Sequence, residues 1–474
     1  MTPAASFLIV RHQLARNSRI DRPACIEVKS VTTIRHIFGV NNRFCRSVRL
    51  ARAFLLLISS LSFCTTPLAA QNAPAQITTS EIKRQDAAIE TVTGVYPGLL
   101  LIPHQTANVI DEKYSQTYHA VCYVYPGDSP TTAGAATTEY LRRFAVHAPD
   151  ADALPLAKRA AKMLLLVYGI NHERLRYDHA FSQTVDVWLT RQNAPNDTGD
   201  IGGEQFRNQI YIYNLYSERR PIEWIREIAH EYGHYALPGT SGYTAPESWA
   251  NGVLGERLFL QWLSDDLRDG RLHADDLPFI TPVMLDEFLA RQTAPLIRRI
   301  ARDGLEERQF GRRDAPGMDY YIGFALYISR VYGSKALLDA FAYTEPQKSG
   351  TVVRASDFLR GALTALSTSP ELTLIPPSAL LQNGTTPLNK AAKHPSADSF
   401  WVYLPRGEYT VSTQGGLRSW QFAGDAKAVH RLDKNGLNEL TVNVSDWRKI
   451  TVALASPTDK PALIRLRRRD AEVR

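Results

Sequence analysis

The residues whose types and spacing specify a chemistry form the segment HEYGH, residues 230–234. Side chains four positions apart on a helix lie on one face about one turn apart, so the imidazoles of His230 and His234 can bind a single metal ion. The carboxylate of Glu231 can then reach a water molecule on that ion. A zinc-dependent peptide hydrolase needs this arrangement, so we expect Zn²⁺ as cofactor and Glu231 as catalytic base.

A catalytic zinc ion takes three protein ligands and keeps a fourth position for water. Two carboxylates follow the histidines in the sequence, Glu247 and Glu256. Glu247 lies in a Pro/Gly-rich loop, whereas Glu256 lies near the start of a strongly helical segment with an apolar face. A second helix packed against the first would bring Glu256 to the metal. The pattern therefore favours Glu256 as the third ligand, with Glu247 as the alternative.

The elements that must position these residues can be predicted from hydrophobic periodicity. Pro221 and the pair Pro238-Gly239 frame a helix that contains HEYGH. The alternating segments 185–190 and 208–216 indicate strands, and residues 193–203 between them indicate a loop. The segment 208–216 is interpreted as an edge strand along which an extended substrate pairs. The remaining expected helices span residues 137–148, 155–169, 249–268, 284–303 and 319–343.

On these motifs the chain resembles the gluzincin superfamily, the zinc peptidases of thermolysin and aminopeptidase-N type. The resemblance covers about residues 157–345 and rests on HEYGH, on Glu256 about twenty residues later, and on the segment 319–341. In aminopeptidase-type members a tyrosine three residues before a glycine stabilises the tetrahedral intermediate. Tyr320 occupies that position, with Tyr321 as the alternative. The G-x-M-E-N segment of the aminopeptidases is absent, so the resemblance does not reach the subfamily.

The expected fold class is α+β, in which the resemblance implies a zincin-like catalytic domain with a small mixed sheet and a helical subdomain. Residues 71–150 would form an N-terminal segment and residues 151–365 the metallopeptidase domain. Residues 366–398 are rich in Pro, Ser, Thr and Asn and indicate a linker. Alternating segments beyond it predict a small antiparallel β domain over residues 399–474.

Composition removes other function classes. The chain carries 55 Lys and Arg and 48 Asp and Glu, but residues 1–52 hold ten of the former and two of the latter. The remaining residues carry a net charge of −1, which argues against a nucleic-acid partner. Three of the four cysteines lie before residue 70 and only Cys122 follows, so neither a disulfide framework nor a cysteine metal site is expected.

Residues 43–71 have the three parts of a secretory signal: a basic flank, an apolar stretch at 53–63 and a small-residue exit at 68–70. The apolar stretch is shorter than the roughly 20 residues that span a bilayer. We therefore interpret residues 1–70 as leader and signal peptide and expect a secreted, periplasmic or extracellular protein without a stable membrane span. An uncleaved anchor is the alternative, and translation could begin near Val48.

The sequence as a whole predicts a secreted zinc metallopeptidase that hydrolyses peptide or protein substrates through a metal-activated water. Zinc would be bound by His230, His234 and Glu256, with Glu231 and Tyr320 as the catalytic residues. The alternative is a catalytically inactive protein that keeps the peptidase fold for binding and uses the C-terminal β domain as its working part.

Overall fold

A computed structural model describes residues 76–78, 87–127, 139–176, 183–195, 202–344, 353–376, 397–414, 417–422, 430–431, 437–454 and 463–469 of the 474. The predicted leader and signal peptide, residues 1–70, and the greater part of the predicted linker lie outside the described residues.

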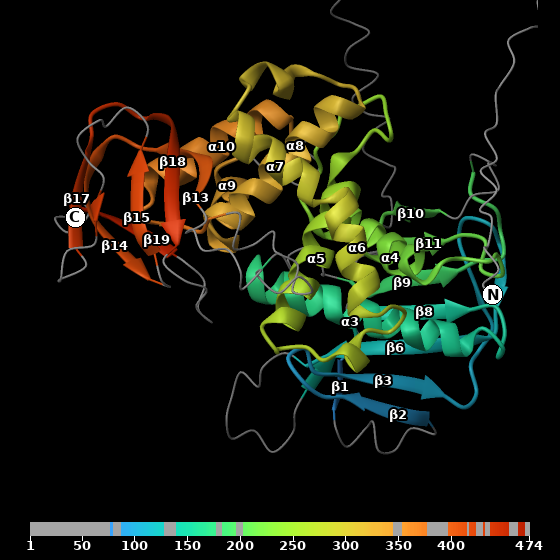
Figure 1. Cartoon of the computed structure of the whole chain (residues 1–474). Helices are drawn as coiled ribbons and strands as arrows, with labels where there is room; N and C mark the ends of the chain where they lie inside the picture. The colour runs from blue at the N-terminus through green and yellow to red at the C-terminus, as the bar shows by residue number, and fades with distance from the viewer. Residues whose placement is uncertain are drawn as a thin grey trace, which may run out of the picture. The chain divides into compact units, whose positions relative to one another are not determined.

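The first half of the described chain forms a seven-stranded mixed sheet (Figure 1). Its strands follow the order β10-β11-β9-β8-β6-β3-β2, and β8, β9 and β11 run parallel to one another while the outer pairs are antiparallel. The bounds are β2 Ala87–Val92, β3 Gly98–Pro103, β6 Ala120–Pro126, β8 Phe144–Ala148, β9 Val185–Leu189, β10 Gly203–Phe206 and β11 Gln209–Ile212. Short strands β1 Gln76–Thr78 and β7 Glu139–Leu141 pair with each other, as do β4 Val109–Ile110 and β5 Thr117–Tyr118.

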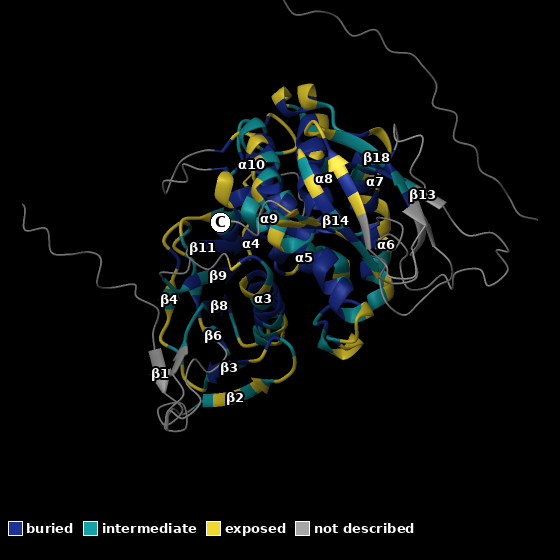
Figure 2. Cartoon of the chain, turned by 90° about the vertical axis from the view of Figure 1, so that its left-hand side faces the viewer, coloured by how far each residue is buried: buried dark blue, intermediate teal, exposed yellow. Residues whose placement is uncertain are grey.

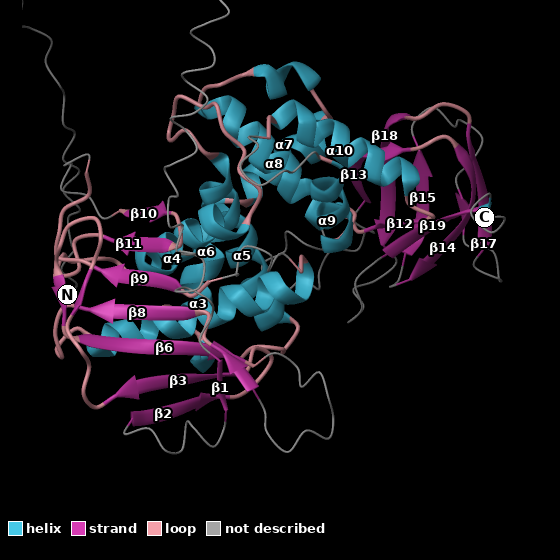
Figure 3. Cartoon of the chain, turned by 180° about the vertical axis from the view of Figure 1, so that it is seen from behind, coloured by secondary structure: helices cyan, strands magenta, loops and turns pink. Residues whose placement is uncertain are grey.

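Helices lie along one face of this sheet, as Figure 3 shows. Helix α3 (Leu154–Arg174) packs on β6 and β8, and α4 (Pro221–Ala236) packs on β10 and β11. Leucine, alanine and other apolar side chains of α3 are almost fully buried there (Figure 2). On the other face the rings of Tyr118, Trp188 and Tyr211 form a separate aromatic cluster. Burial on both faces fixes the register of β8, β9 and β11, because a one-residue slip would reverse every side chain.

Helices form the middle of the chain. They are α5 Ala250–Arg268, α6 Pro282–Gln292, α7 Ala294–Asp303, α8 Ala315–Val331, α9 Ser334–Tyr343 and α10 Ala355–Thr368. The single helices predicted at 284–303 and 319–343 are each two helices. The first is interrupted at Thr293, just before Pro295, and the second at Gly333, whose φ of 88° is incompatible with a right-handed helix.

Two further expectations about elements are wrong. Residues 139–148 form strands β7 and β8 where a helix was predicted, because Phe144 to Ala148 are all buried in the sheet and tertiary packing overrides local helical spacing. Strand β11, predicted as the edge, pairs with β9 on one side and with β10 on the other. The edge of the sheet next to α4 is β10, which begins at the last residue of the predicted loop 193–203 and continues through residues for which no element was predicted.

Two four-stranded antiparallel sheets follow, in the orders β12-β19-β14-β17 and β13-β18-β15-β16. Their strands are β12 Glu371–Leu374, β13 Ala397–Leu404, β14 Gly407–Gln414, β15 Leu417–Phe422, β16 His430–Arg431, β17 Leu437–Val442, β18 Asp446–Leu454 and β19 Leu463–Arg468. The first of these strands lies inside the predicted linker and pairs with the last. The described structure is thus a mixed α+β fold with antiparallel sheets at its C-terminal end, and none of its helices is long and apolar enough to cross a bilayer.

Candidate metal centre

Helix α4 begins where its sequence predicts. Pro221 occupies the first turn, where the missing N–H costs nothing, and the side chain of Glu223 accepts a hydrogen bond from the backbone N–H of Arg220 at 2.9 Å. Trp224, Ile225 and neighbouring apolar residues bury one face of the helix. The opposite face therefore presents His230 and His234 to a cavity.

Glycines bring α4 and α5 unusually close together. A Cβ atom on Gly255 would lie 2.5 Å from the Cα of Gly233, and one on Gly233 would lie 2.7 Å from the carbonyl oxygen of Asn251. Gly252 faces the two histidines, and a Cβ there would lie 2.6 Å from Nε2 of His230 and closer still to Nε2 of His234. The absence of side chains at these three positions lets polar residues of α5 reach the ring nitrogens of α4.

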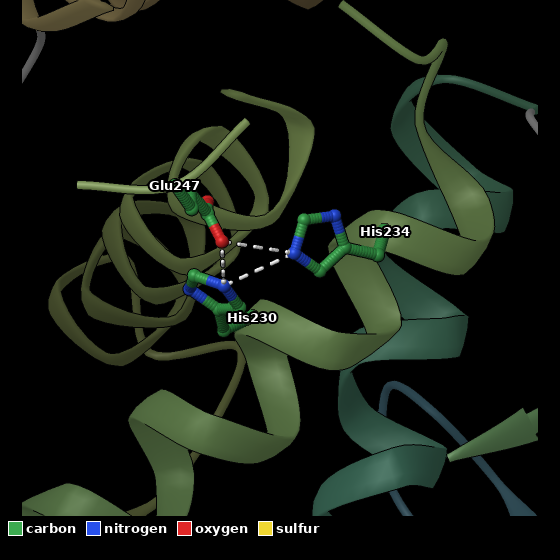
Figure 4. Close-up of side chains that lie close together, drawn as sticks. All are labelled: His230, His234 and Glu247. Carbon is green, nitrogen blue, oxygen red and sulfur yellow. Dashed lines mark hydrogen bonds and ion pairs between the residues drawn. The ribbon is translucent and has the colours of Figure 1, made fainter. Parts of the chain in front are cut away.

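Three ligand atoms converge on one point (Figure 4). Nε2 of His230 lies 3.2 Å from Nε2 of His234, and Oε2 of Glu247 lies 3.2 and 3.3 Å from these two nitrogens. Donors about 2.0–2.1 Å from a tetrahedral zinc ion are about 3.3–3.4 Å apart. The triangle of donor atoms therefore fits one zinc ion, and His, His and Glu are a donor set that zinc accepts.

Glu247, the less favoured candidate in the sequence, supplies the carboxylate of this triangle from the loop between α4 and α5. Burial would raise the pKa of this carboxyl, but its hydrogen bonds with His230 and His234 outweigh burial and lower the pKa to about 2. Its second oxygen, Oε1, is buried and has no hydrogen-bond partner in the described part of the chain. The group is thus held ionised, as a metal ligand must be.

Glu256 lies on the other side of His230. Its Oε2 is 3.4 Å from Nδ1 of that ring, and its Oε1 accepts hydrogen bonds of 2.7 Å from Arg226 and Arg257. Burial opposes ionisation, yet the bond to His230 and the two arginines lower its pKa to about 2. The geometry departs from the expectation that Glu256 is the third ligand: helix α5 directs it to the nitrogen that faces away from the ligand triangle.

Asn251 is a site residue that the sequence interpretation missed. Its Oδ1 lies 3.1 Å from Nδ1 of His234, and its amide donates to the carbonyl oxygen of His234 at 3.0 Å. Asn251 and Glu256 therefore hold the Nδ1 atoms of the two histidines and leave both Nε2 atoms facing Glu247. Such partners orient metal-binding imidazoles. The signal was a polar residue flanked by Gly252 in the first turn of the next helix.

The two contacts of His230 also set its charge. Burial disfavours the protonated ring, but hydrogen bonds to Glu247 and Glu256 outweigh burial and raise the pKa of His230 well above its usual value. A metal ion binding here would displace that proton, because a ligating nitrogen must be unprotonated.

Glu231 is 3% exposed and lines the same cavity. Burial raises the pKa of its carboxyl to about 7, against the nearby His230 and His234, which lower it. Its Oε2 has no hydrogen-bond partner among the described residues, and a Cβ atom on Gly203 would lie 2.6 Å from its Oε1. A carboxyl with a free oxygen and a pKa near neutrality is suited to exchange a proton with a water molecule in the cavity.

The two candidate tyrosines on α8 are engaged elsewhere. The hydroxyl of Tyr320 accepts a hydrogen bond from the backbone N–H of Glu306 at 2.5 Å and donates to the carbonyl oxygen of Gly304 at 3.3 Å. The hydroxyl of Tyr321 lies 2.9 Å from Oγ1 of Thr240. Neither residue lines the cavity. The structure does not bring them to the histidines, although it does bring Glu231 and Glu247 there.

The cavity beside the ligand triangle has a volume of about 520 Å³. Its walls are the edge strand β10, the exposed face of α4 and the loop that carries Glu247. The lining residues are Gly202, Gly203, Glu204, Gln205, Glu227, His230, Glu231, His234, Gly239, Glu247, Ser248, Trp249 and Asn251.

Comparison with known proteins adds no assignment, since no protein-family model and no curated protein matches the chain.

Proposed function

We propose that this protein is a zinc-dependent peptidase with a zincin-like catalytic domain, acting on peptide or protein substrates outside the cytoplasm. The observation that carries the proposal is the triangle of His230, His234 and Glu247, with sides of 3.2–3.3 Å. The Nδ1 partners Asn251 and Glu256 support it. Histidines with a purely structural role do not require both rings to be oriented so that their Nε2 atoms face one point.

The residues of the site can be assigned steps in peptide hydrolysis. Bound zinc would polarise the scissile carbonyl and lower the pKa of a water molecule toward neutrality. Glu231, with its free oxygen in the cavity, would accept the proton of the attacking water and deliver it to the leaving amine. Nothing in the geometry supports Tyr320 as the oxyanion donor.

Strand β10 would position the substrate. Its inner side pairs with β11 and its outer side forms the edge of the sheet, and three of its four residues line the cavity. An extended peptide can add to such an edge through backbone hydrogen bonds. The scissile bond would then lie between the edge strand and the ligand triangle, with Glu231 beside Gly203 at the reacting centre.

The test measures zinc and hydrolysis together in the purified protein. We expect close to one zinc per chain and cleavage of a mixed peptide library, with Glu231→Gln keeping zinc but losing about 10²–10⁴-fold in kcat, the usual contribution of a general base. Glu218→Gln, an exposed carboxylate on the preceding loop, is the matched control.

Two outcomes would contradict the proposal. Full activity in Glu231→Gln would eliminate the mechanism. Zinc binding without hydrolysis of any peptide would favour the alternative, a peptidase-fold protein that only binds its partner.

A further inference from the structure

Helix α4 places a second carboxylate in the cavity that the hydrolytic mechanism does not use. Glu227 lies one turn before Glu231 on the same face of the helix and lines the same cavity. Glu227 is half-buried, and burial raises the pKa of its carboxyl. Among its described contacts Glu227 has neither a hydrogen bond nor an ion pair.

The nearby arginines form neither a hydrogen bond nor an ion pair with Glu227 among the described contacts, although Nε and Nη1 of Arg219 are buried without a hydrogen-bond partner among the described residues. Arg226 donates to Glu256 at 2.7 Å, and Arg219 donates to the carbonyl oxygen of Tyr213 and stacks over the ring of Trp224 at 4.3 Å. Both affect Glu227 only through space. Neither is a lining residue of the cavity, so they leave its open side uncompensated.

The charges of the cavity can be balanced one by one. Of its four lining carboxylates, Glu204 is paired with Lys113 at 2.5 Å and with the hydroxyl of Tyr213 at 2.8 Å. A divalent ion in the ligand triangle would balance Glu247 and Glu231. Glu227 remains as the lining carboxylate without an ion pair or a hydrogen bond among the described residues, and no lysine or arginine is among the described lining residues. A cation that enters the cavity would give Glu227 a direct partner.

We propose that Glu227 is a specificity-determining residue that binds a cationic nitrogen of the substrate beside the scissile bond. This inference rests on the proposed peptidase function. The nitrogen would be an ammonium or guanidinium group, supplied by a Lys or Arg side chain or by a free amino terminus. Trp249, at the end of the loop that precedes α5, lines the same cavity with 42% of its surface exposed. Its ring offers an aromatic face for the carbon chain that carries the cationic nitrogen.

The test compares matched peptides that differ only in this charge. One pair carries Lys or norleucine next to the cleaved bond, at each side in turn, and a second pair has a free or an acetylated amino terminus. For the source that Glu227 recognises, we expect the charged member to have a kcat/KM about ten- to a hundredfold higher, the usual value of a hydrogen bond to a charged group. Glu227→Gln should bring that ratio close to one, and Glu218→Gln should keep the wild-type ratio.

A binding measurement provides a readout that does not depend on turnover. Peptide hydroxamates with the same Lys and norleucine side chains or amino termini, titrated into the zinc-loaded protein, should show the same ratio in Kd and the same loss in Glu227→Gln. Equal binding and hydrolysis of charged and neutral members by the wild-type protein would overturn the inference and leave the peptidase function standing. A preference that survives in Glu227→Gln would also overturn it. Zinc loading with neither hydrolysis nor hydroxamate binding would instead remove the function on which it rests.

Discussion

The α4–α5 contact and helix α8 both bury polar side chains, but they use them differently. On α8, the hydroxyls of Tyr320 and Tyr321 each reach a backbone or side-chain partner inside the protein. Between α4 and α5, the Nδ1 atoms of both histidines are held, while both Nε2 atoms and Oε2 of Glu247 face one shared point. On α8 the hydrogen bonds leave the tyrosine hydroxyls no direction toward a ligand, whereas between α4 and α5 they orient the histidine rings toward a shared point. A candidate site is thus distinguished from a packed core more by the direction in which its Nε2 and Oε2 atoms point than by the types of its residues.

The strongest way to break this contrast is Gly252→Ala. The added methyl group would occupy the space in front of both Nε2 atoms, so we expect zinc affinity to fall by at least a factor on the order of a thousand. The binding free energy of zinc in a four-ligand site is roughly 10–16 kcal/mol, and the loss of one histidine ligand removes several kcal/mol of it. Gly311→Ala is the control, because no described residue other than its chain neighbours has an atom within 4 Å of the added Cβ. Competition with a chromophoric chelator measures the affinity, and unchanged zinc binding would contradict the geometry.

The next largest effects are expected from replacing Glu247 and Glu256, one at a time, by glutamine, which tests which of the two is the metal ligand. Glu247→Gln removes a ligand and should lower zinc affinity by roughly a hundred- to a thousandfold. The metal-free protein should lose less stability than in Glu256→Gln, because Glu247 is more exposed, although it still pairs with the two histidines. Glu256→Gln removes an orienting partner and should lower zinc affinity by only about ten- to a hundredfold. It should also destabilise the metal-free protein by about 3 kcal/mol, since Arg226 and Arg257 lose their buried counter-charge.

Chelator competition and urea denaturation of the two glutamate variants give the four values. The opposite pattern, with zinc lost in Glu256→Gln and kept in Glu247→Gln, would restore Glu256 as the third ligand.

The smallest effect is expected from Tyr320→Phe. Its hydroxyl contacts the backbone at residues 304 and 306, so the variant should lose about 1 kcal/mol of stability, the usual net value of a hydrogen bond. Its kcat should stay within about twofold of the wild type. A loss of about a hundredfold in kcat, typical of a missing oxyanion donor, would return Tyr320 to the reacting centre.

Local sequence signals predicted the two helices and the two histidines of the site but not which glutamate completes the ligand set. Pro221 and Pro238 marked the ends of the HEYGH helix to within two residues, and the next helix was expected at 249–268 and observed at 250–268. The choice between Glu247 and Glu256 depends on the rotation of α5 about its axis, which apolar periodicity leaves undetermined. The close approach at Gly233 and Gly255 sets that rotation, and it turns Glu256 toward Nδ1.

The parts of the fold that were mispredicted share a cause. The helix expected over residues 137–148 and the edge strand expected at 208–216 were assigned from periodicity over short windows. In the sheet β8 is buried on both faces, so it has no polar side to show an alternation, and β11 is covered by β10. Which strand ends a sheet follows from long-range pairing, and that information is absent from a window of ten residues.

The glycines at 233, 252 and 255 have a consequence for recognising sites of this kind in other chains. HExxH alone is a short pattern that arises by chance, whereas H-E-x-G-H followed by N-G-x-x-G-E encodes two of the three ligands, the residues that hold their rings and the room between the two helices. A search for related sites should therefore weight the three small residues as heavily as the metal-binding ones. A chain that kept the histidines but replaced these glycines would have the letters of the motif without the site.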